Sequence, residues 1–361
     1  MANATTNAMQ LLEASLADDF QVECIDQSDC PVFFAVAMPR RPFAEGKTPR
    51  LPCGRGLTRA GAVLSALGEA AELRASLATA DTVKRLGDRK RDGLAYLMVE
   101  NLGSAGLVEV EAQQVFLDWA EIAAEPERFI ANSSGCAAWP DLEGATERGL
   151  LECIERDARA LWWHGKLQCP KRPPHCLDSI QPRLSWWLQQ RRRNFTLIDV
   201  TCDTGVPAVV AASWEPDGSN IAIGSAAAPM LSEASLSATT EMLQTELAMD
   251  IGNVAGNTEL QSWTSRVNAH DLPQFAGGIS ETESPPLTSP VVAHLQALCT
   301  DVLRFDFTAQ GDVLSAVRMM VPHLGGMRQN LNVQRIMDYI GRHPDRTEVR
   351  AVADLDTREP Y

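Results

Sequence analysis

Apolar residues recur at helical spacing in the middle of the chain. Leu150, Ile154, Ala158 and Leu161 fall on one face of a helix that we expect to span residues 142–163. Thr58 is a suitable N-cap for a second helix, rich in Ala, Leu and Glu, that reaches about residue 77. Further helices are expected at residues 1–20, 184–190, 232–250 and 291–302.

Short runs of apolar and β-branched residues predict strands between these helices. The strands are expected at residues 32–37, 94–99, 107–110, 195–200, 208–212, 220–224 and 313–321. Residues 116–122 fit a strand or a short helix, and Gly54 to Gly56 interrupt the chain. Loops rich in Gly, Ser and Pro are expected at residues 132–141, 166–182 and 251–290. Because strands and helices do not alternate regularly, we predict an α+β fold with helices packed on mixed β-sheets.

Composition limits the class of protein. The 361 residues, 45% of them hydrophobic, are enough for a sizeable core. Asp and Glu outnumber Lys and Arg by 47 to 32, and a net charge of −15 argues against nucleic acid as the main partner. The one basic cluster, Arg191 to Arg193, is interpreted as a solvated turn or helix end.

Location and cysteine chemistry follow from the same sequence. The first fifteen residues lack the basic start and long apolar run of a signal peptide, and we find no run of about 18 apolar residues. We therefore expect a cytoplasmic protein, with no membrane as partner, whose nine cysteines are thiols. Cys169, His175 and Cys176 are the best metal-ligand cluster, but prolines interrupt it and it lacks a C-x-x-C pair, so we do not assign zinc.

Acidic residues stand at helical spacing on three of the predicted helices. The helices pair Glu69 with Glu72, Glu152 with Glu155, and Glu241 with Gln244. Carboxylates among Leu, Ile and Ala are costly to bury unless they are paired or bind a cation. Several of them in one cleft would suit Mg²⁺, although spacing alone also fits solvated acidic stripes. The P-loop, H-E-x-x-H and G-x-S-x-G motifs are missing, so a nucleotide would be held in another way.

Three motifs in order resemble the signatures of the YcaO superfamily. The first comprises residues 53–58 (CGRGLT) and 65–72 (SALGEAAE), the second 133–138 (SSGCAA) and 149–158 (GLLECIERDA), and the third 240–244 (TEMLQ). Residues 203–207 (DTGVP) look closest to the branch that forms azoline rings in ribosomal peptides. The resemblance implies a YcaO-like domain over residues 26–345, an N-terminal extension over 1–25 and a C-terminal tail over 346–361.

The resemblance also implies an activity. Such enzymes use ATP to activate a backbone amide of a ribosomally made precursor, and the side chain of Cys, Ser or Thr then closes a thiazoline or oxazoline ring. By matching positions, the residues implied to bind ATP and Mg²⁺ are Ser65, Glu69, Glu72, Glu152, Glu155, Arg156, Glu241 and Gln244. The implied metal ligands are Glu72, Glu152, Glu155 and Glu241. No residue of this chain is assigned as catalytic acid or base.

Three positions depart from the family pattern. Leu73 stands where an arginine is usual, with Arg74 one place late, and Gly144 stands where a glutamate usually precedes the alanine. Ser134 replaces a usual asparagine. The tail also lacks the proline alternation of many azoline-forming members, and these departures leave room for weakened ATP use.

The expected partners are the precursor peptide and a separate protein that binds its leader, because no leader-binding module is recognisable ahead of the YcaO-like part. A flavin dehydrogenase of the same pathway and a homodimer are further partners that the resemblance suggests. Two alternatives stay open: a thioamide- or amidine-forming enzyme, and a degenerate scaffold that binds precursor or partner without catalysis.

Overall fold

The computed structural model describes residues 10–25, 27, 29–41, 51–86, 90–129, 132–282, 284–299, 301–326 and 331–358. The chain forms two compact units. Unit 1 contains the described residues of Met1–Ser28, Phe33–Leu150 and Leu295–Pro322, and unit 2 those of Asp29–Val32, Leu151–His294 and His323–Tyr361. Two helices, α6 (Leu142–His164) and α10 (Val291–Gln296), begin in one unit and end in the other.

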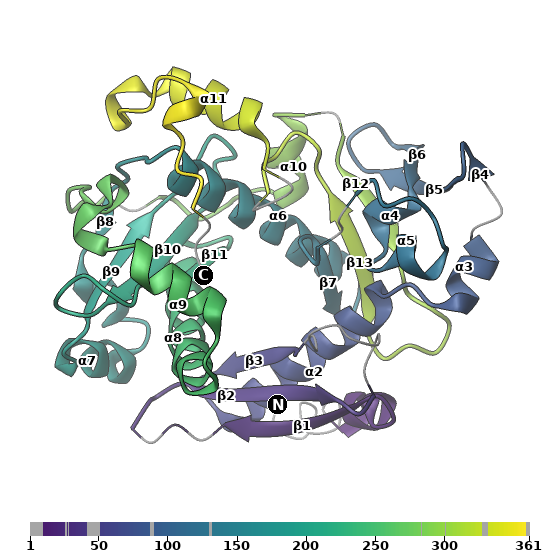
Figure 1. Ribbon diagram of the computed structural model, residues 1–361, viewed down its shortest axis with the longest axis horizontal. Coiled ribbons are helices and arrows are strands. Elements are labelled where there is room, and N and C mark those ends of the chain that lie inside the picture. Colours follow the sequence, from purple (N-terminus) through teal and green to yellow (C-terminus); the bar gives the residue numbers. More distant parts are fainter. Residues whose placement is uncertain are drawn as a thin grey trace. The chain divides into compact units, whose positions relative to one another are not determined.

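Unit 1 is built from two antiparallel sheets and the helices that cover them (Figure 1). The smaller sheet has the order β1 (Phe20–Ile25), β2 (Phe33–Pro39) and β3 (Cys53–Gly56). The larger sheet has the order β4 (Lys90–Arg91), β5 (Leu94–Asn101), β12 (Leu303–Asp306), β13 (Ser315–Met320) and β7 (Cys136–Trp139), with β6 (Gly106–Glu111) also paired to β5. Besides a helical segment at residues 10–16, the helices of unit 1 include α2 (Arg59–Ser76), α3 (Ala80–Leu86), α4 (Ala112–Val115) and α5 (Trp119–Ile122).

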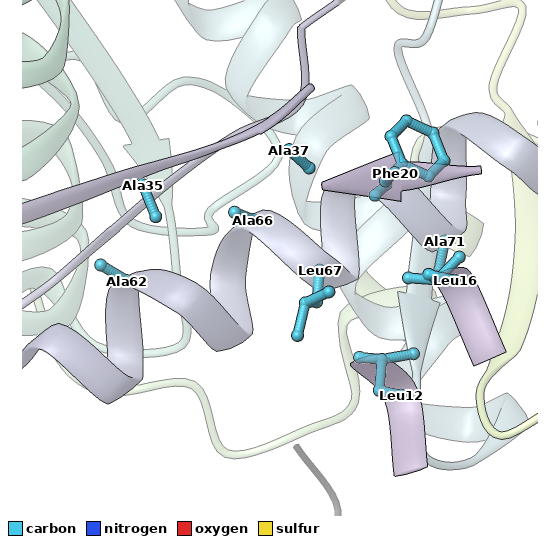
Figure 2. Packing of buried hydrophobic residues seen from close by; sticks show 10 residues of the cluster. Leu12, Leu16, Phe20, Ala35, Ala37, Ala62, Ala66, Leu67 and Ala71 are labelled. Carbon is cyan, nitrogen blue, oxygen red and sulfur yellow. The ribbon is translucent and has the colours of Figure 1, made fainter. Parts of the chain in front are cut away.

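Helix α2 packs closely on the smaller sheet because small residues line the contact. A Cβ atom on Gly54 of β3 would lie 2.2 Å from the Ala62 oxygen and the Ala66 nitrogen, so this position requires glycine. Figure 2 shows part of the core that results, in which Leu12 and Leu16 of the helical segment at residues 10–16 lie near Leu67 and Ala71 of α2. The short side chains bring the backbone of α2 against the strands and set its position in the unit.

Unit 2 has one antiparallel sheet, in the order β11 (Ala222–Ala227), β10 (Ala208–Trp214), β9 (Asn194–Asp199) and β8 (Lys171–Arg172). The long helix α8 (Leu231–Ala255) packs across β10 and β11 (Figure 1). The remaining helices are η1 (Pro174–Leu177), α7 (Pro182–Gln190), α9 (Thr258–Arg266), η2 (Ala269–Asp271), η3 (Pro273–Phe275), α11 (Val333–Arg342), η5 (Pro344–Arg346) and η6 (Val352–Asp354).

The end of α6 is anchored in an aromatic core of unit 2. Trp162 and Trp163 are fully buried, and their rings contact Phe275 and Trp263 respectively at centroid distances of 5.6 Å. Such tilted and edge-to-face ring pairs are favourable arrangements of buried aromatic side chains. They fix the C-terminal half of α6 in unit 2, the unit that also carries Glu152 and Glu155.

The α+β fold class is confirmed. Helices lie on sheets in both units, and the ladders between the named strands are antiparallel, with parallel pairing at the isolated bridges Leu77–Leu117 and Lys171–Ile279. Most predicted long elements are also present, including α2 with its Thr58 cap, where the Thr58 hydroxyl accepts a hydrogen bond from the Gly61 nitrogen at 3.1 Å. The proposed boundaries at residues 25 and 345 stay predictions.

Several local predictions were wrong. The break expected at Gly54 is strand β3, and the loop expected at residues 132–141 contains β7. The excursion expected at residues 251–290 contains the end of α8 and the whole of α9, while the helix expected at 291–302 ends at Gln296. For β3, β7 and the segment at residues 251–290, pairing or packing with a distant segment overrides the local preference of glycine, serine or proline.

The basic cluster is a helix end, but two of its three arginines are not solvated. Arg191 follows α7 and pairs with Glu246, and Arg193 pairs with Glu215 at 2.7 Å and with Glu246 at 3.5 Å. All nine cysteines are free, in agreement with the predicted thiols. No helix in the described ranges is long and apolar enough to cross a bilayer.

Candidate active site

Helix α6 carries two glutamates that share one arginine. The Arg156 guanidinium lies 3.2 Å from Glu152 Oε1 and 3.0 Å from Glu155 Oε1. The side chains of Glu152, Glu155 and Arg156 are 21%, 13% and 26% exposed, so the group is largely shielded from water. Spacing of three and four residues along α6 places Glu152 beside Glu155 and Arg156, and the Arg156 side chain also reaches its sequence neighbour Glu155.

Strand β11 and helix α8 complete this group within unit 2. Ser225 of β11 donates its hydroxyl to Glu155 Oε1 at 2.8 Å. Glu241 of α8 is close enough to interact electrostatically with both Glu155 and Arg156. We call Glu152, Glu155 and Glu241, with Arg156 and Ser225, the carboxylate cluster.

Gly224, which precedes Ser225 on β11, sets the distance from this strand to α8. A Cβ atom on Gly224 would lie 2.2 Å from the Met242 nitrogen, 2.3 Å from the Ala238 oxygen and 2.8 Å from the Glu241 carbonyl carbon. Only glycine allows the helix backbone to approach the strand this closely. Two consecutive residues of β11 therefore hold Glu155 and place Glu241.

The cluster contains more negative than positive charge. Burial raises the pKa of Glu155 to about 7; Arg156 and Ser225 act to lower it, and Glu241 and Glu152 act to raise it. Burial alone would lower the pKa of Arg156, but the three carboxylates outweigh this and raise it. Three carboxylates against one guanidinium give a net charge of −2 when all are ionised.

This donor set suits a hard divalent cation. Mg²⁺ takes carboxylate oxygens as ligands and shares them with nucleotide phosphates, and its charge would balance the excess of the cluster. Arg156 would remain available as a fork-shaped donor for phosphate oxygens. As they stand, no three Asp, Glu, His or Cys side chains of the described residues are grouped closely enough to hold a metal ion. Glu152, Glu155 and Glu241 would therefore hold Mg²⁺ only after their carboxylates turn toward one another, and the metal would then supply positive charge for bound phosphates.

The other sequence-predicted residues lie on α2 in unit 1 and further along α8 in unit 2. Glu69 and Glu72 line a cavity of about 350 Å³ in unit 1. The rest of its lining consists of Leu51, Pro52, Leu73, Leu117, Asn132 and Ser133. Ser65 is half-buried one turn before Glu69 and is not part of this lining, and Gln244 is half-buried one turn after Glu241. The structure thus brings Glu152, Glu155, Arg156 and Glu241 together in one unit, and Glu69 and Glu72 at one cavity in the other.

The unusual glycine at position 144 has a structural cause within unit 1. A Cβ atom on Gly144 would lie 2.0 Å from Cδ1 of Trp139, and Arg148 stacks on the same indole at 3.5 Å from its centroid. The Trp139 ring therefore fills the space that a side chain at position 144 would need. Arg74, which stands one place late, donates to the Ser15 carbonyl at 2.7 Å and lies 3.8 Å from Asp19.

Sequence reasoning missed Ser225 and Gly224. Neither residue belongs to a recognisable motif, and a lone Gly-Ser pair at a strand carries little information. Their importance depends on how β11 packs against α6 and α8, which the local sequence does not reveal. The sequence feature nearest to these two residues was the strand predicted at residues 220–224, which ends at Gly224.

Comparison with known proteins agrees with the motifs. The model of the family described as "YcaO cyclodehydratase, ATP-ad Mg2+-binding" matches residues 90–325, which is more than half of the chain. The chain belongs to the YcaO family. ATP and Mg²⁺, expected from the sequence, are the ligands named for this family. The matched range includes the carboxylate cluster and begins after Ser65, Glu69 and Glu72.

The individual proteins that match this chain share only part of its sequence. An uncharacterized protein of Methanothermobacter thermautotrophicus is 29% identical over an alignment of 212 residues, and the match covers 53% of this chain and 54% of that protein. A heterocyclase solved in complex with substrate and cofactor has a TM-score of 0.81 at 19% identity and covers 98% of this chain and 57% of its own. YcaO from Methanopyrus kandleri, solved with AMPPCP and Mg²⁺, has a TM-score of 0.69 at 16% identity and covers 100% and 96%.

These solved structures share the YcaO fold with this chain. The chain spans about half of the length of the curated relatives that it matches.

Proposed function

We propose that this chain activates backbone amides of a ribosomally made precursor peptide with ATP and forms thiazoline or oxazoline rings from Cys, Ser or Thr. The observation that carries the proposal is the carboxylate cluster, in which Glu152 and Glu155 pair with Arg156 in a largely buried setting and Glu241 adds a third negative charge nearby. Membership of the YcaO family, described as ATP- and Mg²⁺-binding, supports the same chemistry.

The proposed reaction divides the work between the peptide and the protein. A side-chain nucleophile of the peptide attacks the preceding amide carbon, and the amide oxygen accepts the γ-phosphoryl group of ATP and leaves as phosphate. The sum is one azoline, ADP and phosphate per ring, with the oxygen of the lost water carried by phosphate. Such chemistry depends on positioning and charge neutralisation more than on covalent help from the protein.

Individual residues of the cluster take separate roles in this proposal. Glu152, Glu155 and Glu241 hold Mg²⁺, Arg156 binds phosphate oxygens, and Ser225 fixes the orientation of the Glu155 carboxylate. Glu69, Glu72 and Ser65 of α2 are proposed to take part in ATP binding by their match to the first signature, together with Gln244 from the third. A leader-binding protein is the proposed partner that delivers the precursor.

One observation favours a second candidate, a scaffold that binds precursor or partner without ATP turnover. The usual glutamate at position 144 is a glycine, and Trp139 fills the space beside it. A site that lacks one carboxylate would bind Mg²⁺ and ATP less tightly.

The test is the mass of the peptide after incubation with this protein, its partner and ATP, with the precursor sought among the products of neighbouring genes. Loss of one water per modified residue supports azoline formation, and it should disappear in Glu155→Gln but persist in Glu233→Gln, an exposed glutamate on α8. Exchange of oxygen for sulfur would instead identify a thioamide-forming enzyme. Unchanged peptide mass together with intact ATP would leave the scaffold as the better description.

A further inference from the structure

Arg335 of α11 binds two carboxylates of unit 2 at the same time. Its Nη2 and Nε atoms lie 2.8 and 3.2 Å from the two oxygens of Asp157, and its Nη1 atom lies 2.8 Å from Asp203 Oδ2. The Arg335 side chain is 3% exposed and that of Asp157 is 0% exposed. Arg342 adds a contact to Asp203 at 2.7 Å.

The network is electrically balanced and well saturated. Two aspartates face two arginines, and the Gly325 nitrogen donates a further hydrogen bond to Asp157 Oδ1 at 2.7 Å. Removing one partner of such a buried pair leaves an uncompensated charge, so these contacts constrain the segments that carry them. The segments are α6, the turn after β9 that carries Asp203, Gly325 and α11.

Asp157 directly follows Arg156 on α6. Successive helical residues are turned by about 100° from one another, so the two side chains reach different neighbours. Arg156 contacts Glu152 and Glu155, whereas Asp157 contacts Arg335 and the Gly325 nitrogen. The turn of α6 that carries Glu152, Glu155 and Arg156 is thus held by α11 through Asp157, on a different face of the helix.

We propose that Arg335 is a positioning residue, which fixes the rotation of the Glu152–Arg156 turn so that Arg156 and Glu155 can receive magnesium-bound ATP. The inference rests on the proposed function of the carboxylate cluster. Arg335 acts through Asp157 and makes no contact with nucleotide in this proposal.

Arg335→Lys is the informative change, because lysine keeps the charge but lacks the planar fork that spans both aspartates. Arg358→Lys is the matched control. Arg358 also pairs with a buried aspartate of unit 2, Asp356, whose side chain is 3% exposed, and Asp356 contacts the end of α6 at the His164 carbonyl. Magnesium-dependent ATP affinity is measured by calorimetry, well below the melting temperature of each variant.

Arg335→Lys should weaken ATP binding about tenfold or more, while Arg358→Lys should change it less than about twofold at a similar loss of melting temperature. Equal affinity in the native chain and Arg335→Lys, or an equal loss in both variants, overturns the proposal. If Arg335→Lys does not fold, Asp203→Asn serves instead, since it removes one of the two carboxylates and should weaken binding by about threefold; no change overturns the proposal.

Hydrogen exchange of the backbone amides at residues 152–156 separates this inference from the proposed function. If the native protein binds no ATP, the proposed function fails and the affinity comparison does not apply; faster exchange in Arg335→Lys than in Arg358→Lys then still shows that Arg335 fixes this turn of α6. Unchanged exchange in Arg335→Lys overturns the positioning role.

Discussion

Glu155 is the residue on which the electrostatics of the site depend. Burial, helped by the neighbouring Glu241 and Glu152, raises its pKa to about 7, although Arg156 and the Ser225 hydroxyl act to lower it. A carboxyl group with this pKa is half-protonated near neutral pH, because the positive charge around it does not offset its burial and the neighbouring carboxylates. We expect Mg²⁺ to supply that charge and to return Glu155 to its ionised form.

The raised pKa predicts how stability depends on pH without ligand. A carboxyl group whose pKa is raised in the folded state stabilises the fold at low pH, and this contribution is lost as pH rises from about 4.5 to about 7. The native protein should therefore lose about 2–3 kcal/mol between pH 5 and pH 8 relative to Glu155→Gln, which stays neutral. Denaturant unfolding at both pH values measures this difference.

The control for this prediction is Glu233→Gln, which changes an exposed carboxylate on α8. It should follow the pH dependence of the native chain. If the stability of Glu155→Gln falls as steeply with pH as that of the native chain, Glu155 does not titrate as proposed.

At the scale of elements, the spacing of apolar residues and the Thr58 cap were sufficient to predict helices α6 and α2. Leu150, Ile154, Ala158 and Leu161 are all buried, as their helical spacing indicated. Strand β3 could not be predicted, because its glycines disfavour a strand locally; Gly54 is needed there only because α2 packs against it. The acidic residues of the site were found from helical spacing and motifs. The roles of Ser225 and Gly224 could not be found in this way, because they depend on how β11 packs against α6 and α8.

The contact between β11 and α8 gives a prediction at this scale. Gly224→Ala should destabilise unit 2 by about 1–3 kcal/mol, because its methyl group would overlap the α8 backbone near Ala238 and Met242. It should also weaken ATP binding by displacing Glu241. Gly341→Ala is the matched control, since a Cβ atom there meets nothing within 4 Å in α11 and should stabilise the helix by up to about 1 kcal/mol. Equal melting temperatures for Gly224→Ala and the native chain would contradict this account.

At the scale of the whole molecule, the residues matched to the three signatures are divided between the two units. Unit 1 carries Glu69 and Glu72 at a cavity, and unit 2 carries the carboxylate cluster. The family match and the α+β fold agree with the sequence motifs, while the pathway and the partners stay predictions. The proposed binding of Mg²⁺ and ATP to the carboxylate cluster involves no peptide, so it can be tested without knowing the precursor.

Calorimetric titration of ATP into the full chain, with and without Mg²⁺, tests the central claim most directly. The native chain should bind ATP in a magnesium-dependent manner, and a double change of Glu152→Gln and Glu241→Gln should weaken this binding at least about tenfold without unfolding the protein. Glu233→Gln, on the same helix as Glu241, should bind as the native chain does. Equal magnesium-dependent affinity in the double variant and the native chain would show that the carboxylate cluster is not the metal–nucleotide site.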